Sequence, residues 1–277
     1  MTLSFRSIGL ALAALLLGAA AASAAPVVKG PERGTLIIAG GGKLGPEIVG
    51  RFITLAGGPA APIVVIPTAG GEAKYGPDCD CLAMFRKLGA SNLTVLHTTD
   101  RKEADSEAFV EPLKHARAVW FVGGRQWHLV DSYAGTRTEA EIKALLTRGG
   151  VVGGTSAGAS IQASYLVRGA VSGNEVLMAP DHEVGWGLIS GVGVDQHVTA
   201  RHREGDLDFL VAKHPELLGI GIDQSTAIEV KADSFSVLGA GHVFIHDGAE
   251  QPNGGHYYLM IPGDRFDFAK LTATAKR

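Results

Sequence analysis

The stretch Val151-Val-Gly-Gly-Thr-Ser156-Ala-Gly158-Ala-Ser160 indicates a buried strand that ends at a serine between glycines and turns directly into a helix. Residues 154–158 fit the pattern G-x-S-x-G, which is typical of a nucleophile elbow. A serine on such a sharp turn presents its hydroxyl above the sheet, and the tight backbone leaves room only for small residues two positions away. The N–H groups that open the helix lack intrahelical partners and face the same space. The turn could therefore supply a nucleophile and an oxyanion donor, or it could be an ordinary glycine-rich turn.

The first residues have the pattern of a targeting signal. Arg6 precedes the apolar run Ile8–Leu17, and Ala22-Ser23-Ala24 fits an A-x-A cleavage site. The apolar run is too short for a comfortable transmembrane helix. We predict that residues 1–24 are a signal peptide cleaved near Ala24, and that residues 25–277 form a single domain. The mature protein is then periplasmic or secreted, with no stable membrane insertion.

Composition excludes several classes of function. The chain has 277 residues, of which 46% are hydrophobic, enough for one sizeable core. Its formal net charge is −3 and no stripe of lysines and arginines is present, which argues against nucleic-acid binding. Cys79 and Cys81 are the two cysteines, and export leaves a disulfide between them open. No histidine lies close to them and two sulfurs do not complete a zinc site, so we expect no metal.

The order of apolar runs predicts the fold class. Short apolar runs alternate with helical patterns from residue 35 to about residue 166. Strands that are apolar on both faces are typical of a parallel sheet covered by helices, so we predict a three-layer α/β/α sandwich with a mainly parallel sheet. Glycine loops follow three of these strands, at 40–42, 70–71 and 123–124, and should share one edge of the sheet with Ser156. Neither of the first two loops has the G-x-G-x-x-G pattern, so no nucleotide cofactor is expected. Short β-like runs after residue 188 indicate extra strands towards the C-terminus.

A serine hydroxyl needs a base to take its proton, and His197 is the best candidate. It ends the run Val194-Asp195-Gln196-His197, after a glycine-bounded apolar stretch, whereas most other histidines have no distinctive setting. The apolar run Gly219–Ile222 leads to Asp223 and Gln224, either of which could hold the imidazole in one tautomer. An ordinary strand end remains open for each of these positions.

These motifs together resemble the cyanophycinase and peptidase E family of serine peptidases. The resemblance rests on six segments in the same order: residues 34–42, 63–69, 121–126, 154–159, 195–201 and 221–228. It implies a flavodoxin-like, class I glutamine-amidotransferase-like fold and hydrolysis of aspartyl peptide bonds without metal or cofactor. Cyanophycinases cut an isopeptide polymer of aspartate and arginine to β-aspartyl-arginine, and peptidase E-like members cut after an N-terminal aspartate.

The resemblance also implies roles for individual residues. Ser156 matches the nucleophile and His197 the base, and Gln224 stands in the place of the third triad member. The N–H groups of Gly123 or Gly124 and of Ala157 would form the oxyanion hole. The implied partner is a peptide or a cyanophycin-like polymer, and a homodimer is left open. The residues that match substrate-binding positions are Gln126, Asp195, Gln196 and Arg201.

Two positions depart from the cyanophycinase pattern. Cyanophycinases carry a glutamate where Gln224 stands, and they tend to carry an arginine where Asp206 stands. A glutamine carbonyl can accept the imidazole N–H, but an amide cannot stabilise the imidazolium by charge. One alternative is therefore a catalytically impaired homologue that acts as a periplasmic peptide-binding or regulatory protein. A second is a dipeptidase acting on N-terminal aspartate. An α/β-hydrolase lipase or esterase shares the elbow, but its acid precedes the histidine in chain order.

Overall fold

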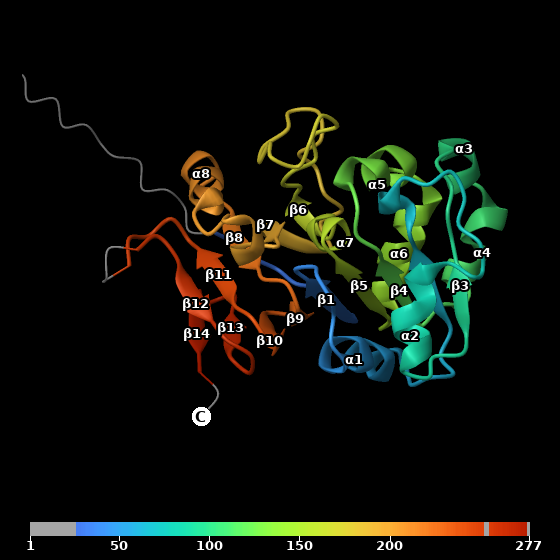
Figure 1. Cartoon of the computed structure of the whole chain (residues 1–277). Coiled ribbons are helices and arrows are strands. Elements are labelled where there is room, and N and C mark those ends of the chain that lie inside the picture. The colour runs from blue at the N-terminus through green and yellow to red at the C-terminus, as the bar shows by residue number, and fades with distance from the viewer. Residues whose placement is uncertain (1–25, 252–254, 276–277) are drawn as a thin grey trace, which may run out of the picture.

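Strand β1 (Thr35–Ala39) lies near the middle of the larger of two sheets in the computed structural model, which describes residues 26–251 and 255–275 (Figure 1). The predicted signal peptide, residues 1–24, lies outside the described residues. Within the described ranges no helix is long and apolar enough to cross a membrane.

The larger sheet joins a parallel half to an antiparallel half. β1, β5, β4, β2 and β3 run parallel, whereas β9 pairs with β1 antiparallel and begins the C-terminal half. Figure 1 shows β9 and β10 on one side of β1, and β5 and β4 on the other. Among the described residues this sheet has nine strands, in the spatial order β14 (Thr272–Thr274), β13 (Arg265–Asp267), β10 (Ser234–Gly239), β9 (Thr226–Lys231), β1, β5 (Val151–Thr155), β4 (Ala118–Phe121), β2 (Ile63–Ile66) and β3 (Leu93–Val95).

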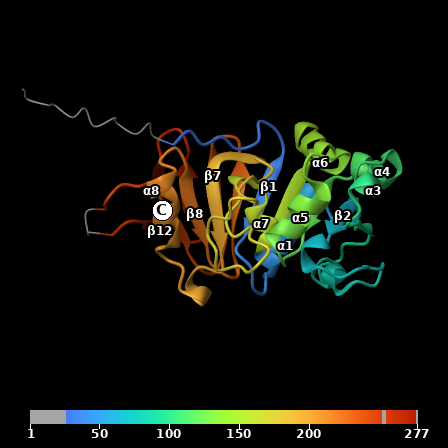
Figure 2. The ribbon, with the colours of Figure 1, turned by 90° about the horizontal axis from the view of Figure 1, so that it is seen from above.

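A second sheet lies against the larger one, a detail that the sequence did not indicate. In the described part of the chain it has five strands, in the order β12 (Tyr258–Met260), β11 (Val243–His246), β8 (Leu218–Ile222), β7 (Ile189–Gln196) and β6 (Ala163–Tyr165). In Figure 2, β7 and β8 lie on the side of the molecule away from α3 and α4. The predicted α/β fold and extra C-terminal strands are confirmed, and those strands divide between the two sheets.

Helices α1 to α7 pack around the parallel half of the larger sheet, whereas α8 packs against β7, β8 and β11 of the second sheet. The bounds of the helices are α1 (Pro46–Ala56), α2 (Ala83–Lys87), α3 (Arg101–Ala104), α4 (Glu107–His115), α5 (Gln126–Tyr133), α6 (Arg137–Thr147), α7 (Ala157–Ser160) and α8 (Asp206–Lys213). Short 3₁₀ turns occur at Thr68–Gly70, Asp80–Leu82 and Thr199–Arg201. Helix α1 shows how local signals set these bounds. Pro46 lacks the N–H that the first turn leaves unpaired, and Gly57 adopts φ 111° to end the helix.

Alternating side chains of the sheet build two separate cores. On one face Ile37 packs with Phe52 of α1 and Phe85 of α2. On the other face Leu36 belongs to a larger core shared by α4, α6 and the second sheet, which contributes residues such as Ile220. Successive side chains of a strand point to opposite faces of the sheet, so one continuous apolar run supplies apolar side chains to both cores.

Parallel strands bring their carboxyl ends to one edge of the sheet, and the second sheet reaches the same edge. The N–H of His197, directly after β7, donates to the carbonyl of Gly40, directly after β1, at 2.8 Å. The N–H of Ser156, directly after β5, donates to the carbonyl of Ala39 at 3.0 Å. Two segments 41 residues apart in sequence are thereby fixed around the end of β1.

Candidate active site

Ser156 stands on a sharp turn between β5 and α7, with φ 55° and ψ −115°. The two flanking glycines are sterically required. A Cβ on Gly154 would lie 2.1 Å from the carbonyl oxygen of Gly158, and a Cβ on Gly158 would lie 2.4 Å from that of Phe121. The elbow predicted from the G-x-S-x-G pattern is therefore present, and its hydroxyl is held away from the sheet by the backbone.

His197 lies beside the serine. Its Nε2 atom is 2.9 Å from Oγ of Ser156, and the residue itself has φ 57°. Gly41 packs against the imidazole, because a Cβ at that position would lie 2.2 Å from Cε1 of His197. The ring is therefore fixed by a backbone hydrogen bond to Gly40 and by close contact with the next glycine.

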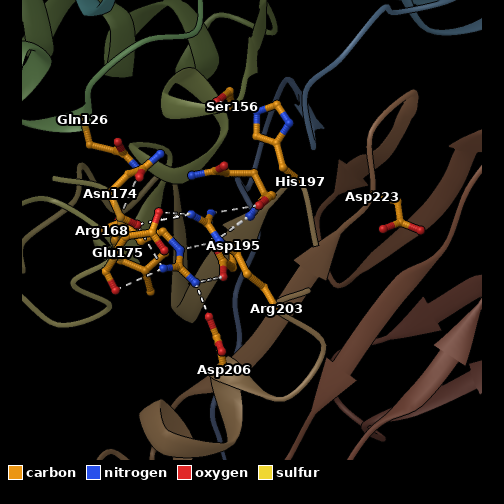
Figure 3. Close-up of polar contacts among 12 residues, drawn as sticks. Gln126, Ser156, Arg168, Asn174, Glu175, Asp195, His197, Arg203, Asp206 and Asp223 are labelled. Atoms are coloured by element: carbon orange, nitrogen blue, oxygen red, sulfur yellow. Dashed lines mark hydrogen bonds and ion pairs between the residues drawn. The ribbon is translucent and has the colours of Figure 1, made fainter. Parts of the chain in front are cut away.

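Gln224 completes a line of three side chains. Its amide Nε2 lies 2.8 Å from Nδ1 of His197, on the side of the ring opposite the serine. Asp223, the other candidate, points away from His197 in Figure 3. Its carboxylate accepts hydrogen bonds from the backbone N–H groups of Thr199 at 2.9 Å and His242 at 3.1 Å. The structure therefore brings Gln224, and not Asp223, to the histidine.

The environment of His197 favours its neutral form. Burial, the largest cause, and the positive charges of Arg201 and Arg203 together lower the pKa of the imidazole to about 4. Asp195 opposes this shift. A neutral imidazole at neutral pH is the form that can accept a proton from a serine hydroxyl.

Two of the residues predicted for the oxyanion hole, Gly123 and Ala157, adjoin the serine. Gly123 follows β4 and touches the elbow, since a Cβ there would lie 3.2 Å from Cβ of Ser156. Gly124 has φ 146° and packs against the backbone of Ala69. Ala157 is the first residue of α7, so its N–H has no partner within the helix.

Three of the predicted substrate-binding side chains lie on the side of the larger sheet that the second sheet covers. Gln126 is 1% exposed at the start of α5, and its Nε2 donates to the carbonyl of Val167 at 3.4 Å. Gln196 is 2% exposed, and its Oε1 has no hydrogen-bond partner among the described residues. Arg201 is exposed. When the side-chain amide of Asn174 is oriented with its oxygen towards Arg201, Nη1 of Arg201 donates a hydrogen bond to that oxygen at 2.8 Å.

Comparison with known proteins agrees with this geometry. The sequence profile of Peptidase family S51 matches residues 36–238. The chain belongs to peptidase family S51. It is 34% identical over 258 residues to a cyanophycinase of Geminocystis herdmanii, covering 85% of this chain and 94% of that protein. It is 33% identical over 254 residues to a cyanophycinase of Nostoc, covering 82% of each. It is therefore a cyanophycinase-like serine peptidase of this family.

Two solved peptidase structures share this fold. A peptidase from an acI-B1 actinobacterium superposes with a TM-score of 0.62 at 24% identity, covering 86% of this chain and 98% of that one. A putative peptidase E protein of Listeria monocytogenes gives a TM-score of 0.53 at 16% identity, covering 75% and 99%. At these identities the likeness supports the fold.

One predicted role in this S51 peptidase needs correction. Asp195, expected at the substrate, is fully buried, and its carboxylate accepts two hydrogen bonds from Arg168, at 2.8 and 2.7 Å (Figure 3). Arg203 approaches the same carboxylate at 3.6 Å, and Arg168 also pairs with Asp206. Asp195 therefore positions these arginines beneath the site, since its oxygens are occupied by them.

Arg168 was missed by sequence reasoning. The only local signal is a cation directly after the buried run Tyr165–Val167, and nothing in the sequence pairs it with a carboxylate 27 positions away.

Cys79 and Cys81 are joined by a disulfide in the loop before α2. In the described ranges no group of three or more histidine, cysteine, aspartate or glutamate side chains could hold a metal ion.

Proposed function

We propose that this S51 peptidase is exported and hydrolyses aspartyl peptide or isopeptide bonds, cutting cyanophycin to β-aspartyl-arginine dipeptides. One observation carries the proposal. The side chains of Ser156, His197 and Gln224 form a hydrogen-bonded line with steps of 2.9 and 2.8 Å. Such a line is the geometric signature of an activated serine nucleophile.

Acylation begins at Oγ of Ser156. The oxygen attacks the carbonyl carbon of the scissile bond while Nε2 of His197 accepts the hydroxyl proton. The carbonyl oxygen becomes an oxyanion, stabilised by the N–H of Ala157 and by that of Gly123 or Gly124. Each such donor is worth roughly 3 kcal/mol in comparable sites.

Collapse of the tetrahedral intermediate breaks the carbon–nitrogen bond. The proton held on Nε2 of His197 passes to the departing amine, which leaves as a neutral amine, and an acyl-enzyme on Ser156 remains. Water then attacks the ester while Nε2 of His197 accepts its proton, and that proton passes to Oγ of Ser156 as the carbon–oxygen bond breaks and the acid product leaves. Gln224 contacts Nδ1 of the imidazole and orients the ring in both halves of the cycle, with its amide oxygen turned towards Nδ1 so that the Nδ1–H has an acceptor.

The polar side chains next to the elbow suit an aspartyl residue. Arg201 is exposed and lies close enough to lower the pKa of His197, so its guanidinium can grip a substrate carboxylate. Within the described residues Oε1 of Gln196 is a buried acceptor without a hydrogen-bond partner, an arrangement that costs roughly 1–3 kcal/mol. A substrate N–H would satisfy it. Gln126 supplies a further buried amide at the start of α5.

Purified mature protein mixed with cyanophycin tests the proposal, with β-aspartyl-arginine measured by chromatography. We expect release from the wild type and none above background from Ser156→Ala. Release that survives Ser156→Ala would overturn the nucleophile assignment. Cleavage of Asp-X dipeptides alone would identify a dipeptidase acting on N-terminal aspartate. Binding of these ligands by calorimetry without hydrolysis over hours would identify a peptide-binding protein.

Export is tested separately. The motif Ala22-Ser23-Ala24 supports a mature chain that begins at Ala25. N-terminal sequencing of the protein recovered from the periplasm or the medium should give that residue. Recovery only as the full-length chain in the cytoplasm would contradict export and leave the peptidase assignment intact.

A further inference from the structure

We propose that the disulfide between Cys79 and Cys81 is a thiol-exchange site, at which a small neutral or cationic thiol reduces it. Both cysteines line a cavity of about 540 Å³ in the loop before α2. They are the only cysteines of the chain, so the thiol comes from another molecule. The residues that line the cavity do not include Ser156, His197 or Gln224, so this chemistry is separate from that of the serine.

The bridge contributes little to holding the fold together. The two cysteines are two positions apart, and the stabilisation that a disulfide gives through the unfolded chain grows with the length of the loop it closes. Backbone hydrogen bonds hold the same segment independently. The N–H of Cys79 donates to the carbonyl of Gly76 at 3.1 Å, and the N–H of Leu82 donates to that of Cys79 at 3.0 Å. The reduced protein should therefore keep its fold, as an exchange site requires.

A small molecule can approach both cysteines. Each of them is partly exposed, and exposed disulfides are the labile ones, whereas structural disulfides resist reduction. Pro67, Tyr75 and Val122 line the same cavity and offer apolar surface to the carbon chain of a thiol. The cavity therefore combines access to the disulfide with a surface on which a small thiol can rest.

One hydrogen bond makes the two sulfurs unequal. The N–H of Cys81 donates to Sγ of Cys79 at 3.2 Å. A hydrogen bond of this kind favours the charged form of its acceptor, and in thiol–disulfide exchange the more stable thiolate leaves faster. The incoming thiolate therefore attacks Sγ of Cys81, and the electron pair of the broken sulfur–sulfur bond remains on Cys79.

A second thiol completes the reduction. The first step leaves a mixed disulfide between Cys81 and the small thiol. A second thiolate attacks the outer sulfur of that mixed disulfide, and Cys81 leaves as a thiolate. The two small thiols end joined as one disulfide, so two electrons have passed to the protein. The two cysteines take up the two protons that the small thiols lost when they ionised.

The charges around the cavity select among thiols. Asp78 and Asp80 line the cavity on either side of one sulfur and are exposed, whereas Lys74 is the one cation among the described lining residues. The nearby Glu72 and Arg86 carry opposite charges and leave this balance unchanged. Two carboxylates against one ammonium give a negative field, which repels an anionic thiol and attracts a cationic one. The site should therefore disfavour anionic thiols such as glutathione.

Exchange with three thiols of two carbons each tests the proposal: cysteamine, 2-mercaptoethanol and 2-mercaptoethanesulfonate. Free cysteines are trapped with iodoacetamide and located by mass spectrometry, and rates are compared at equal thiolate concentration. The folded protein should be reduced with its circular dichroism unchanged, and the first adduct should lie on Cys81. Cysteamine should react at least about threefold faster than the sulfonate, with a gap that narrows at high salt. A disulfide reduced only after denaturant unfolds the protein, or reduction that itself unfolds it, would overturn the site.

Matched variants separate the charge effect from general changes. Asp80→Asn should narrow the preference for cysteamine by about twofold. Asp233→Asn makes the same change at an exposed position between β9 and β10 and should keep the preference. Ser156→Ala should exchange at the wild-type rate, so the result does not depend on the proposed peptidase. Equal rates for the three thiols would overturn the selection by charge, and a first adduct on Cys79 would overturn the direction of attack.

Discussion

Nε2 of Gln224 lies 2.8 Å from Nδ1 of His197, in the position that an acid occupies in a Ser-His-acid triad. An amide can present two different atoms to the ring. When its NH₂ group donates to Nδ1, the imidazole proton stays on Nε2, and Ser156 then faces a donor that cannot take its proton. When the amide carbonyl accepts from Nδ1–H, Nε2 is free to act as the base. Rotation of one amide by half a turn thus decides whether the line of three side chains supports catalysis.

Gln224→Glu should raise kcat. A carboxylate has only acceptors, so it fixes the proton on Nδ1, and its charge stabilises the imidazolium that forms during attack. The reverse change in a serine protease cost about 10⁴-fold, which bounds the gain; we expect about tenfold or more. Gln251→Glu adds the same charge where the side chain donates to the carbonyl of Ala249, and it should leave kcat unchanged. A Gln224→Glu enzyme no faster than wild type would show that the amide already supports His197 as well as a carboxylate does.

The pH profile should follow the low pKa of His197. Burial and two nearby arginines lower that pKa to about 4, and only the neutral imidazole accepts a proton. We expect kcat/KM to rise with pH around a midpoint of about 4 and to stay flat through neutrality. In Gln224→Glu the added negative charge favours the imidazolium, so the midpoint should move to higher pH. A wild-type midpoint near 6.5, the ordinary value, would contradict the electrostatic reading of the site.

Local rules account for the parts of the site that the sequence predicted. The elbow at Ser156 follows from sterics among residues 154–158, which are contiguous, so a pattern of five residues is enough. The position of His197 follows from strand β7, which ends in polar residues, and the N–H of His197 donates to the carbonyl of Gly40. The carboxyl ends of parallel strands lie at one edge of the sheet, so the sequence alone predicts that the glycine loops and the serine lie together.

Long-range pairing accounts for what the sequence did not predict. β8 and β9 are both short apolar runs close together in the chain, yet β9 joins the larger sheet and β8 the second one. Their patterns carry no sign of this difference, because which strand pairs with which depends on partners far away in sequence. The pair of Arg168 with Asp195 was missed for the same reason, since each residue alone looks like an ordinary polar strand end.

Arg168→Met should destabilise the protein strongly. The substitution leaves the fully buried carboxylate of Asp195 without its main partner, a change that costs about 3–5 kcal/mol. For a chain of this size that corresponds to a fall in Tm of roughly 10 °C, measured by calorimetry. Arg137→Met removes an exposed ion pair with Glu107 and should lower Tm far less. Adding Asp195→Asn to Arg168→Met should restore part of the lost stability. If the double variant is no more stable than Arg168→Met, the loss comes from packing and not from the unpaired charge.

Gly41→Ala should abolish most activity while the protein stays folded. Gly41 has φ 107°, and a Cβ there would lie 2.2 Å from Cε1 of His197, so the imidazole or the loop must move. A displacement of about 1 Å of a catalytic group costs on the order of 100-fold in rate. We expect kcat to fall by at least that factor, with the far-ultraviolet circular dichroism unchanged.

Gly50→Ala is the matched control for the loss at Gly41. Gly50 lies within α1, and a Cβ there would meet nothing within 4 Å. Alanine is the better helix former, so this variant should gain up to about 1 kcal/mol of stability and keep the wild-type kcat. The contrast isolates the contact with the imidazole, since both substitutions add the same methyl group to nearby parts of one loop and helix. If Gly41→Ala kept the wild-type kcat, the loop after β1 would have to be free to move away from His197, and its packing would no longer explain how the ring is held against Ser156.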